Sequence, residues 1–146
     1  MTRSMFAQVL ANLDGADLNA FASGANFNDV APNAWYANAV NWASSLGIVS
    51  GVGNNNFAPS DNITREQMAV MLFRFIEIME IEIPLSQANT TFTDQQSISP
   101  WAVGAVQLMQ TAGILSGHPN GSFAPQDTAT RAEVATMFAR FLALVS

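Results

Sequence analysis

Two long stretches of the chain are apolar on nearly every face that a helix would present. They follow Thr64 and Thr130, and their large apolar residues recur at helical spacing on most faces, which predicts two helices buried on most sides. Thr64 with Gln67, and Thr130 with Glu133, have the spacing of a capping box, so each threonine is expected to begin its helix. Residues 3–13 predict a shorter helix of the same kind.

A shorter amphipathic stretch precedes each long one. Apolar spacing predicts a helix over about 34–46, capped by Asn33 and ended by Gly47. In the second stretch Ser99 is expected to cap and Gly113 to end the helix. Turn-rich loops follow over 51–60 and 117–126, each with one central phenylalanine, Phe57 and Phe123, expected to pin it.

These elements recur because the chain repeats itself. A shift of 66 residues lays positions 35–76 on positions 101–142 without a gap, and 18 of these 42 positions are identical. Met1-Thr2-Arg3 resembles the start of the helix at Thr64, without the capping box because Met5 replaces its glutamate or glutamine. We therefore expect two full repeats and the last part of one before them.

Charge and composition exclude several functions. The net charge is −6, and the only cations besides the N-terminus and one histidine are five arginines, so a large basic patch for nucleic acid cannot form. No apolar run reaches 18 residues, so no membrane-spanning segment is predicted, and no signal peptide is recognisable. The chain has no cysteine, and His118 is its only histidine, so a cluster of histidine ligands cannot form. The Asn54-Asn55-Asn56 loop with Asp61 hints at calcium, but its spacing does not match an EF-hand loop, and we predict no metal site and no cofactor.

Arg3, Arg65 and Arg131 each follow the capping threonine of a predicted helix. A cation is mildly unfavourable there, because the helix dipole is positive at its N-terminus. One interpretation is a binding site in which the guanidinium and free amides hold a carboxylate or phosphate. The other is internal: an ion pair to Asp29 or Asp94, or a hydrogen bond to a loop carbonyl.

Other repeated residues have both a ligand-binding and a structural interpretation. The tryptophans could stack on a sugar ring or belong to the core, and the aspartates of Phe-x-Asp could bind sugar hydroxyls or hold turns. The Ser-Gly pairs could let a ligand approach the backbone or simply make a turn. These candidates are Trp35, Trp101, Asp29, Asp94, Ser50, Ser116, Gly51 and Gly117.

The repeat resembles the S-layer homology family. The first copy carries Phe27-Asn-Asp29-Val, Trp35-Tyr-Ala-Asn-Ala-Val40, Gly47-Ile-Val-Ser-Gly51, Phe57-Ala-Pro59 and Ile63-Thr-Arg65-Glu-Gln. The second closes in Thr130-Arg-Ala-Glu133, which matches the family's Thr-Arg-Ala-Glu signature in full. Gln67 and Met5 depart from it at the glutamate.

The resemblance implies a mainly α fold, with helix-loop-helix repeats around a central three-helix bundle of pseudo-threefold symmetry. The expected segments are 1–26 (end of a first repeat and linker), 27–91 (repeat and linker) and 92–146 (repeat), all in one compact domain. It further implies ligand binding by Arg65, Arg131 and Arg3, and, as groove residues, by Asp29, Asp94, Trp35 and Trp101.

The function implied is non-catalytic anchoring to the bacterial cell wall, as a secreted protein of the S-layer surface. The expected partner is a secondary cell wall polysaccharide bearing pyruvylated N-acetylmannosamine, whose ketal carboxylate suits an arginine. The alternative is a structural self-assembly or protein-interaction module of a surface-layer protein. An edge left open by the incomplete first repeat would then pair copies into a homo-oligomer. No acid–base or nucleophile constellation suggests an enzyme.

Overall fold

A computed structural model describes residues 1–23 and 27–146. Its elements are α-helices, two short 3-10 helices and irregular loops, and no strand occurs in the described part of the chain. Extended pairing is limited to isolated bridges such as Thr2 with Asn62 and Thr64 with Thr128. The predicted mainly α class is confirmed.

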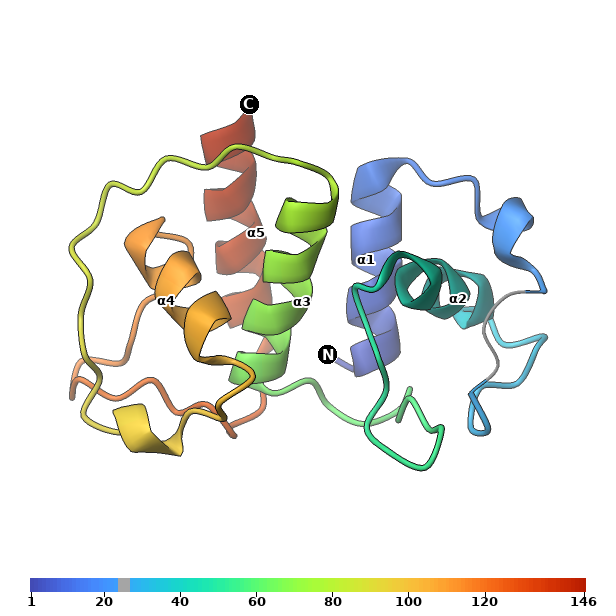
Figure 1. The fold of residues 1–146 in the computed structure, drawn as a ribbon, viewed down its shortest axis with the longest axis horizontal. Helices are drawn as coiled ribbons and strands as arrows, with labels where there is room; N and C mark the ends of the chain where they lie inside the picture. Colours follow the sequence, from blue (N-terminus) through green and yellow to red (C-terminus); the bar gives the residue numbers. More distant parts are fainter. Residues whose placement is uncertain (24–26) are drawn as a thin grey trace. The chain divides into compact units, whose positions relative to one another are not determined.

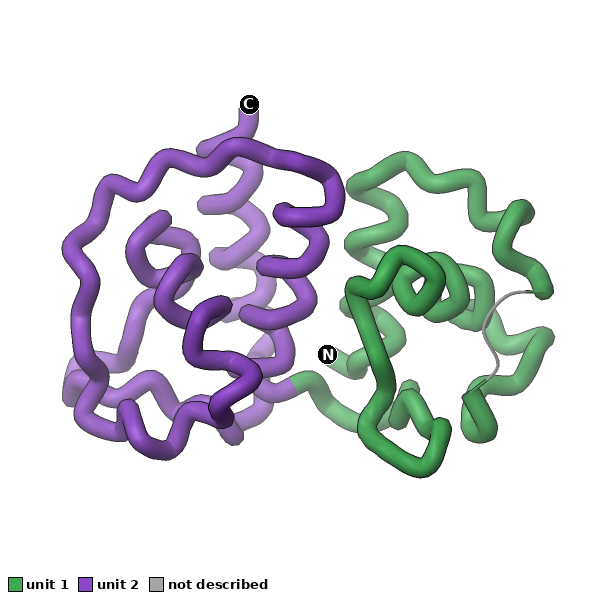
Figure 2. Tube along the Cα trace, in the orientation of Figure 1, with its two compact units in different colours: residues 1–63 green, residues 64–146 purple. Residues whose placement is uncertain are grey.

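The chain divides into two compact units, residues 1–63 and residues 64–146 (Figure 2). Unit 1 holds α1 (Arg3–Asp14), the 3-10 helix η1 (Leu18–Phe21) and α2 (Ala37–Leu46) (Figure 1). In this unit α1 packs against α2, and η1 lies against α2, where the side-chain amide of Asn41 donates to the Phe21 carbonyl at 2.9 Å.

Unit 2 holds α3 (Arg65–Ile78), the 3-10 helix η2 (Gln95–Ser97), α4 (Val103–Thr111) and α5 (Arg131–Val145). Here α3 packs against α4, as α1 packs against α2 in unit 1. Phe75 of α3 and Phe141 of α5 meet edge to face, with ring centroids 6.5 Å apart. Each compact unit therefore combines a Thr-Arg helix with the shorter helix and loop that follow it.

The predicted helix starts at the three threonines are confirmed. Thr64 with Gln67 and Thr130 with Glu133 form complete capping boxes, in which each side chain bonds to the other residue's backbone amide. Thr2 accepts the Met5 amide at 3.2 Å, but the box is incomplete because Met5 has no polar group to bond back to the Thr2 amide. The left-handed residue Gly47 ends α2, as predicted.

The starts of the two shorter helices were predicted wrongly. Helix α2 begins at Ala37 after a series of turns, so Asn33 is not its cap, and α4 begins at Val103. Ser99 instead gives its amide and hydroxyl to the Glu66 carboxylate, at 2.9 and 2.7 Å. The sequence pattern could not reveal that the Glu66 side chain of α3 accepts these two hydrogen bonds.

The burial predicted for the helix after Thr130, α5, is also wrong. Helix α3 is buried over most of its length, whereas α5 buries only Val134, Met137 and Phe141. The two sequences are similar, so the difference comes from what surrounds them. Packing of the 3–13 helix with the other two in a central bundle, and the three predicted sequence segments, stay predictions.

The two linkers lie along the shorter helices of their units. The linker over 80–91 is tied to α4, since the Gln87 amide donates to the Thr111 carbonyl and the Gln110 side chain donates to Ala88. The end of the linker expected over 14–26 lies outside the described residues. Within the described ranges, no helix has the length and apolar character needed to cross a bilayer.

Candidate functional site

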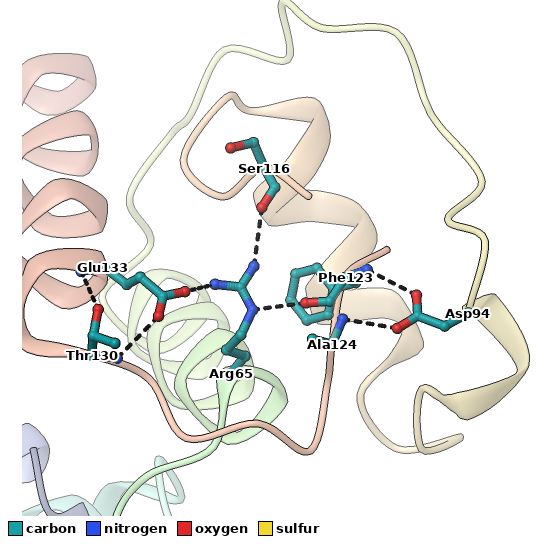
Figure 3. A network of polar contacts seen from close by, with 7 residues as sticks. All are labelled: Arg65, Asp94, Ser116, Phe123, Ala124, Thr130 and Glu133. Atoms are coloured by element: carbon teal, nitrogen blue, oxygen red, sulfur yellow. Dashed lines mark hydrogen bonds and ion pairs between the residues drawn. The ribbon is translucent and has the colours of Figure 1, made fainter. Parts of the chain in front are cut away.

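Arg65 is the centre of a polar network in unit 2 (Figure 3). Its guanidinium lies over the Phe123 ring at 4.8 Å, and its Nε donates to the Phe123 carbonyl at 2.7 Å. One terminal nitrogen donates to the Ser116 carbonyl at 3.0 Å, and the other pairs with the Glu133 carboxylate. These bonds explain how a guanidinium only 4% exposed is tolerated.

Asp94 holds the loop to which Arg65 binds. Its two carboxylate oxygens accept the amides of Phe123 and Ala124, both at 2.8 Å, as Figure 3 shows. Burial by itself would raise the pKa of Asp94, but these hydrogen bonds and nearby His118 outweigh it and hold that pKa below its ordinary value. Phe92 of the same Phe-x-Asp motif packs on Phe123, with ring centroids 5.2 Å apart.

Unit 1 contains the same arrangement. Arg3 donates through Nε to the Phe57 carbonyl at 2.9 Å and lies 4.8 Å from the Phe57 ring centroid. Asp29 accepts the amides of Phe57 and Ala58, both at 2.8 Å, and Phe27 packs on Phe57. The motif residues thus form the same geometry in both units: the arginine bonds to the carbonyl of a loop whose amides are held by the aspartate.

Two interpretations of the arginines were open: a ligand site or an internal contact. At Arg3 and Arg65 the internal hydrogen bond to a loop carbonyl is present. Burial lowers the pKa of each guanidinium, and the charges of Asp61 and Asp29 around Arg3, and of Asp127 and Asp94 around Arg65, offset part of that effect. Arginine starts so far above neutrality that both side chains remain cations at pH 7. Arg131, in contrast, is exposed.

A surface hollow of about 280 Å³ lies beside Arg65. Arg140 lines it and also lines a second hollow, of about 320 Å³, which shares Ser116 and Gly117 with the first. The side chain of Arg140 makes no hydrogen bond or ion pair within the described residues. The first hollow is lined by Arg65, Ile114, Leu115, Ser116, Gly117, His118, Ala132, Glu133, Thr136, Met137 and Arg140.

The sequence analysis missed Arg140 and Glu133 as members of this site. Glu133 was interpreted as a capping residue, which it is, but its second oxygen reaches Arg65. Arg140 matches Arg74 in the repeat, so the pairing of Arg65 with Arg140 is not a repetition of one sequence position. Arg65 lies on α3 and Arg140 lies on α5. Folding of these two helices around one hollow is what brings the two arginines together.

The two candidate glycines are packed against their own repeat. A Cβ at Gly117 would stand 2.8 Å from the Phe92 ring and 2.9 Å from the Ser122 carbonyl, and one at Gly51 would stand 2.9 Å from the Phe27 ring. Gly117 also lines both hollows, so the same residue is closely packed within its repeat and lies where a ligand could approach the backbone. The Ser50 and Ser116 side chains are exposed, and Ser116 reaches Arg65 through its carbonyl.

The two candidate tryptophans are surface residues. Trp35 is 63% exposed and Trp101 is 56% exposed, so the interpretation as core residues is wrong. Neither side chain lines the two hollows beside the Ser116–Gly117 backbone. Within the described residues, no group of three histidine, cysteine or carboxylate side chains could hold a metal ion.

Comparison with known proteins agrees with this geometry. The sequence profile of the S-layer homology domain matches residues 26–69 and 91–135, which include both copies of Phe-x-Asp and the two complete capping boxes.

Similar proteins are much longer than this chain. An amylopullulanase of Thermoanaerobacterium thermosulfurigenes is 37% identical over 137 residues, which are 94% of this chain and 7% of that protein. A surface-layer 125 kDa protein of Lysinibacillus sphaericus is 33% identical over 79% of this chain and 10% of its own length. A cellulosome-anchoring protein of Acetivibrio thermocellus is 28% identical over 97% of this chain and 32% of its own length.

The profile covers more than half of the chain, and the residues it matches build the buried-arginine loops of both units. The chain therefore belongs to the S-layer homology domain family.

Proposed function

We propose that this chain is a non-catalytic module that anchors a protein to the bacterial cell surface by binding an anionic secondary cell wall polymer. Family membership supports the anchoring role, as do relatives named as a cellulosome-anchoring protein and a surface-layer protein. The amylopullulanase supports the lack of catalysis, because the similar region is only 7% of that enzyme. The module would act outside the cell, at the wall.

The observation that carries the binding proposal is the hollow shared by Arg65 and Arg140. The side chain of Arg140 is exposed and has no polar partner among the described residues, while Arg65 lines the same hollow and keeps one unused proton on each terminal nitrogen. Two guanidinium groups around one hollow suit a carboxylate, because charge-assisted bonds from arginine are strong and directional. A pyruvyl ketal on an N-acetylmannosamine supplies such a carboxylate on a sugar.

The repeated residues around the hollow fit contact with a sugar chain. Ser116 and Gly117 line both hollows, and Gly117 has no side chain, so we propose that a polymer occupies both hollows beside this backbone. We propose that exposed Trp35 and Trp101 offer stacking surfaces, one per repeat. Asp29 and Asp94 would act by holding the loops, because both oxygens of each are already used by amides.

Arg3 and Arg131 complete the proposed set in different ways. Arg3 repeats the environment of Arg65 in unit 1, so it would serve an equivalent site beside Ser50 and Gly51. Arg131 lines neither hollow, and its proposed ligand contact depends on a loop that would cover it. In the described chain we therefore expect Arg65 and Arg140 to dominate.

Co-sedimentation with purified Gram-positive cell walls tests the proposal. Binding should disappear after chemical removal of the secondary polymer. Arg140→Ala should weaken it by roughly ten- to a hundredfold, since a charge-assisted hydrogen bond contributes on the order of 1.5–3 kcal/mol. Arg131→Ala is the matched control, because it removes an exposed arginine of the same helix outside the hollow. Walls bound equally well without the polymer, or equal binding by the two variants, would contradict the proposal.

The alternative function, self-assembly through a homo-oligomer, is supported by one observation. Helix α5 exposes Leu142 and Val145, at 44% and 39% of their surface, in addition to Arg131. Light scattering over a range of concentrations separates the two functions. A mass that rises with concentration, together with no binding to walls, would favour self-assembly, and a monomer that binds the polymer would favour anchoring.

A further inference from the structure

The linker that follows α3 contains a stretch of backbone that bonds to nothing else in the described chain. The Ile81 amide donates to the Ile76 carbonyl at 3.0 Å, and the Gln87 amide donates to the Thr111 carbonyl at 2.9 Å. Between these two anchors, residues 82–86 make no hydrogen bond or ion pair within the described residues. This stretch can therefore bond to another molecule without first breaking a bond of its own.

The same residues are irregular in conformation and mostly exposed. Figure 1 shows the linker as an irregular yellow-green trace that leaves the end of α3. Leu85 is 59% exposed, and its neighbours Pro84 and Ser86 are exposed as well. Pro84 has no amide proton and disfavours a helical conformation at the residue before it. A large apolar side chain is thus displayed on an accessible backbone that is not helical.

A backbone with free amides and carbonyls is what the cleft of an endoprotease binds. The main chain of an extended peptide pairs with its partner as an added strand does, and a pocket of the protease takes the side chain before the cleaved bond. Helices and closed turns must unfold locally before they enter such a cleft, and local unfolding costs free energy. Residues 82–86 are free of that cost.

We infer that the peptide bond between Leu85 and Ser86 is a cleavage site for an extracellular endoprotease with a deep apolar pocket. Leu85 fills the pocket, and the small Ser86 follows the cleaved bond. The oxygen of one water molecule adds to the Leu85 carbonyl carbon, and the bond to the Ser86 nitrogen breaks. The products are a carboxylate on Leu85 and an amine on Ser86, which takes up a proton. The enzyme is extracellular because the module is proposed to act at the wall, but cleavage itself does not depend on polymer binding.

Cleavage at this bond divides the candidate site between two chains. Arg65 lies on α3, before the bond, and Arg140 lies on α5, after it, although both line the hollow of about 280 Å³. In the cut chain this hollow depends on noncovalent contacts, such as the hydrogen bonds from Arg65 to the Phe123 and Ser116 carbonyls. The linker thereby offers a route by which an anchored protein is released from the wall.

Two tryptophans provide an internal comparison for this inference. Trp35 is 63% exposed and Trp101 is 56% exposed, close to the value for Leu85. Each lies inside a turn, residues 34–37 and 99–102, closed by a backbone hydrogen bond of 3.0 or 2.8 Å. The hydrophobic slot of chymotrypsin accepts an aromatic side chain at least as readily as leucine. Side-chain exposure alone would direct the first cut to a tryptophan, whereas a free backbone directs it to Leu85.

Brief digestion of the folded chain with chymotrypsin tests the inference, with the fragments identified by mass spectrometry. We expect the first products to be residues 1–85 and 86–146, formed about tenfold or more faster than any other pair. Leu85→Asp should slow cleavage at this bond about tenfold or more, because an apolar pocket rejects a carboxylate. Leu85→Phe should keep it. Both substitutions change an exposed side chain, so the fold should remain.

Two controls separate backbone freedom from sequence preference. Leu142→Asp changes an exposed leucine of α5 and should leave the cleavage rate at Leu85 unchanged. In the urea-unfolded chain, Trp35 and Trp101 should be cut at least as fast as Leu85. These digests contain no polymer, so their failure is distinct from failure of the wall-binding test. A first cut at either tryptophan of the folded chain, or equal rates at this bond with and without Leu85→Asp, would overturn the inference.

Discussion

The carboxylate of Glu133 pairs with the guanidinium of Arg65 while it also closes the capping box of α5. One oxygen accepts the Thr130 amide at 3.1 Å, and the other contacts a terminal nitrogen of Arg65 from α3. A single side chain thus ties two helices of unit 2 together. It also places an internal anion at the edge of the hollow where the polymer carboxylate is proposed to bind.

Glu133→Gln separates these two roles. Gln67 shows that glutamine closes the same capping box on α3, so the substitution should keep the cap and remove only the charge beside Arg65. We expect a loss of about 1 kcal/mol in the free energy of unfolding, since Glu133 is partly exposed. Polymer binding should become several-fold tighter, because Arg65 loses its internal competitor.

Glu133→Ala is the matched comparison. It removes the ion pair and the cap together, so it should cost a further ~1 kcal/mol beyond glutamine. Urea unfolding gives the stabilities, and co-sedimentation with cell walls gives the affinities. Equal or weaker wall binding by Glu133→Gln would show that Glu133 does not compete with the ligand.

The glycines that follow the candidate serines should be needed for folding rather than for ligand access alone. A Cβ at Gly117 would stand 2.8 Å from the Phe92 ring, so Gly117→Ala should destabilise by about 1–3 kcal/mol. Gly51→Ala should cost more, since Gly51 also has a positive φ of 86°.

Gly104→Ala in α4 is the control for these substitutions. No atom lies within 4 Å of a Cβ built at Gly104, and the backbone is helical, so alanine should stabilise by about 0.5–1 kcal/mol. Thermal and urea unfolding measure all three. Similar destabilisation at Gly104 and Gly117 would contradict the argument from packing against Phe92.

Asp94 should make stability depend on pH in the acid range. Its pKa is lowered in the folded chain, because the amide bonds and His118 outweigh the effect of burial. A carboxyl with a lowered folded pKa stabilises fully above its unfolded pKa, about 3.9, and that contribution is lost as pH falls through the folded value. Unfolding free energy should therefore fall with pH below about 4.

Asp94→Asn tests the assignment. Asparagine offers one acceptor to two amides, so the Phe123–Ala124 loop should loosen and the protein should lose about 1–2 kcal/mol at pH 7. The variant should also show a smaller loss of stability between pH 5 and pH 3. An unchanged acid slope in urea unfolding would assign that slope to other carboxyls.

Much of the fold follows from local sequence. The capping boxes at Thr64 and Thr130, the helix end at Gly47 and the buried loop phenylalanines were predicted because neighbours within a few residues determine them. The start of α4 was missed because the Ser99 amide and hydroxyl bind Glu66, 33 residues away. A bond at that separation leaves no periodic signal.

The candidate site also divides into features that the sequence predicts and features that only the folded chain determines. The repeat identified Arg65, Asp94 and Gly117 as a set, but it could not decide whether the arginine faces solvent or a loop carbonyl. Folding decides this by placing the Phe123 carbonyl on the guanidinium. Arg140 was missed because the sequence analysis singled out only the arginines that follow the three threonines, whereas this arginine enters the hollow from further along α5.

Arg65 and Arg131 occupy the same repeat position, but their substitution should affect stability very differently. Arg65→Ala leaves the Phe123 and Ser116 carbonyls and the Glu133 carboxylate without their partner in a site that is almost fully buried. Loss of one member of such a network costs about 3–5 kcal/mol. Arg131→Ala removes an exposed side chain and should change stability by no more than about 0.5 kcal/mol.

Arg65→Lys refines this comparison. Lysine keeps the charge but loses the planar guanidinium that bonds the Phe123 carbonyl through Nε and lies over the Phe123 ring, so most of the loss should remain. Urea unfolding of the three variants measures the differences. If Arg65→Lys restores full stability, its positive charge alone explains the role of Arg65. If Arg131→Ala destabilises as much as Arg65→Ala, then the Arg131 side chain is buried in the folded chain and the contrast between the two repeat positions fails.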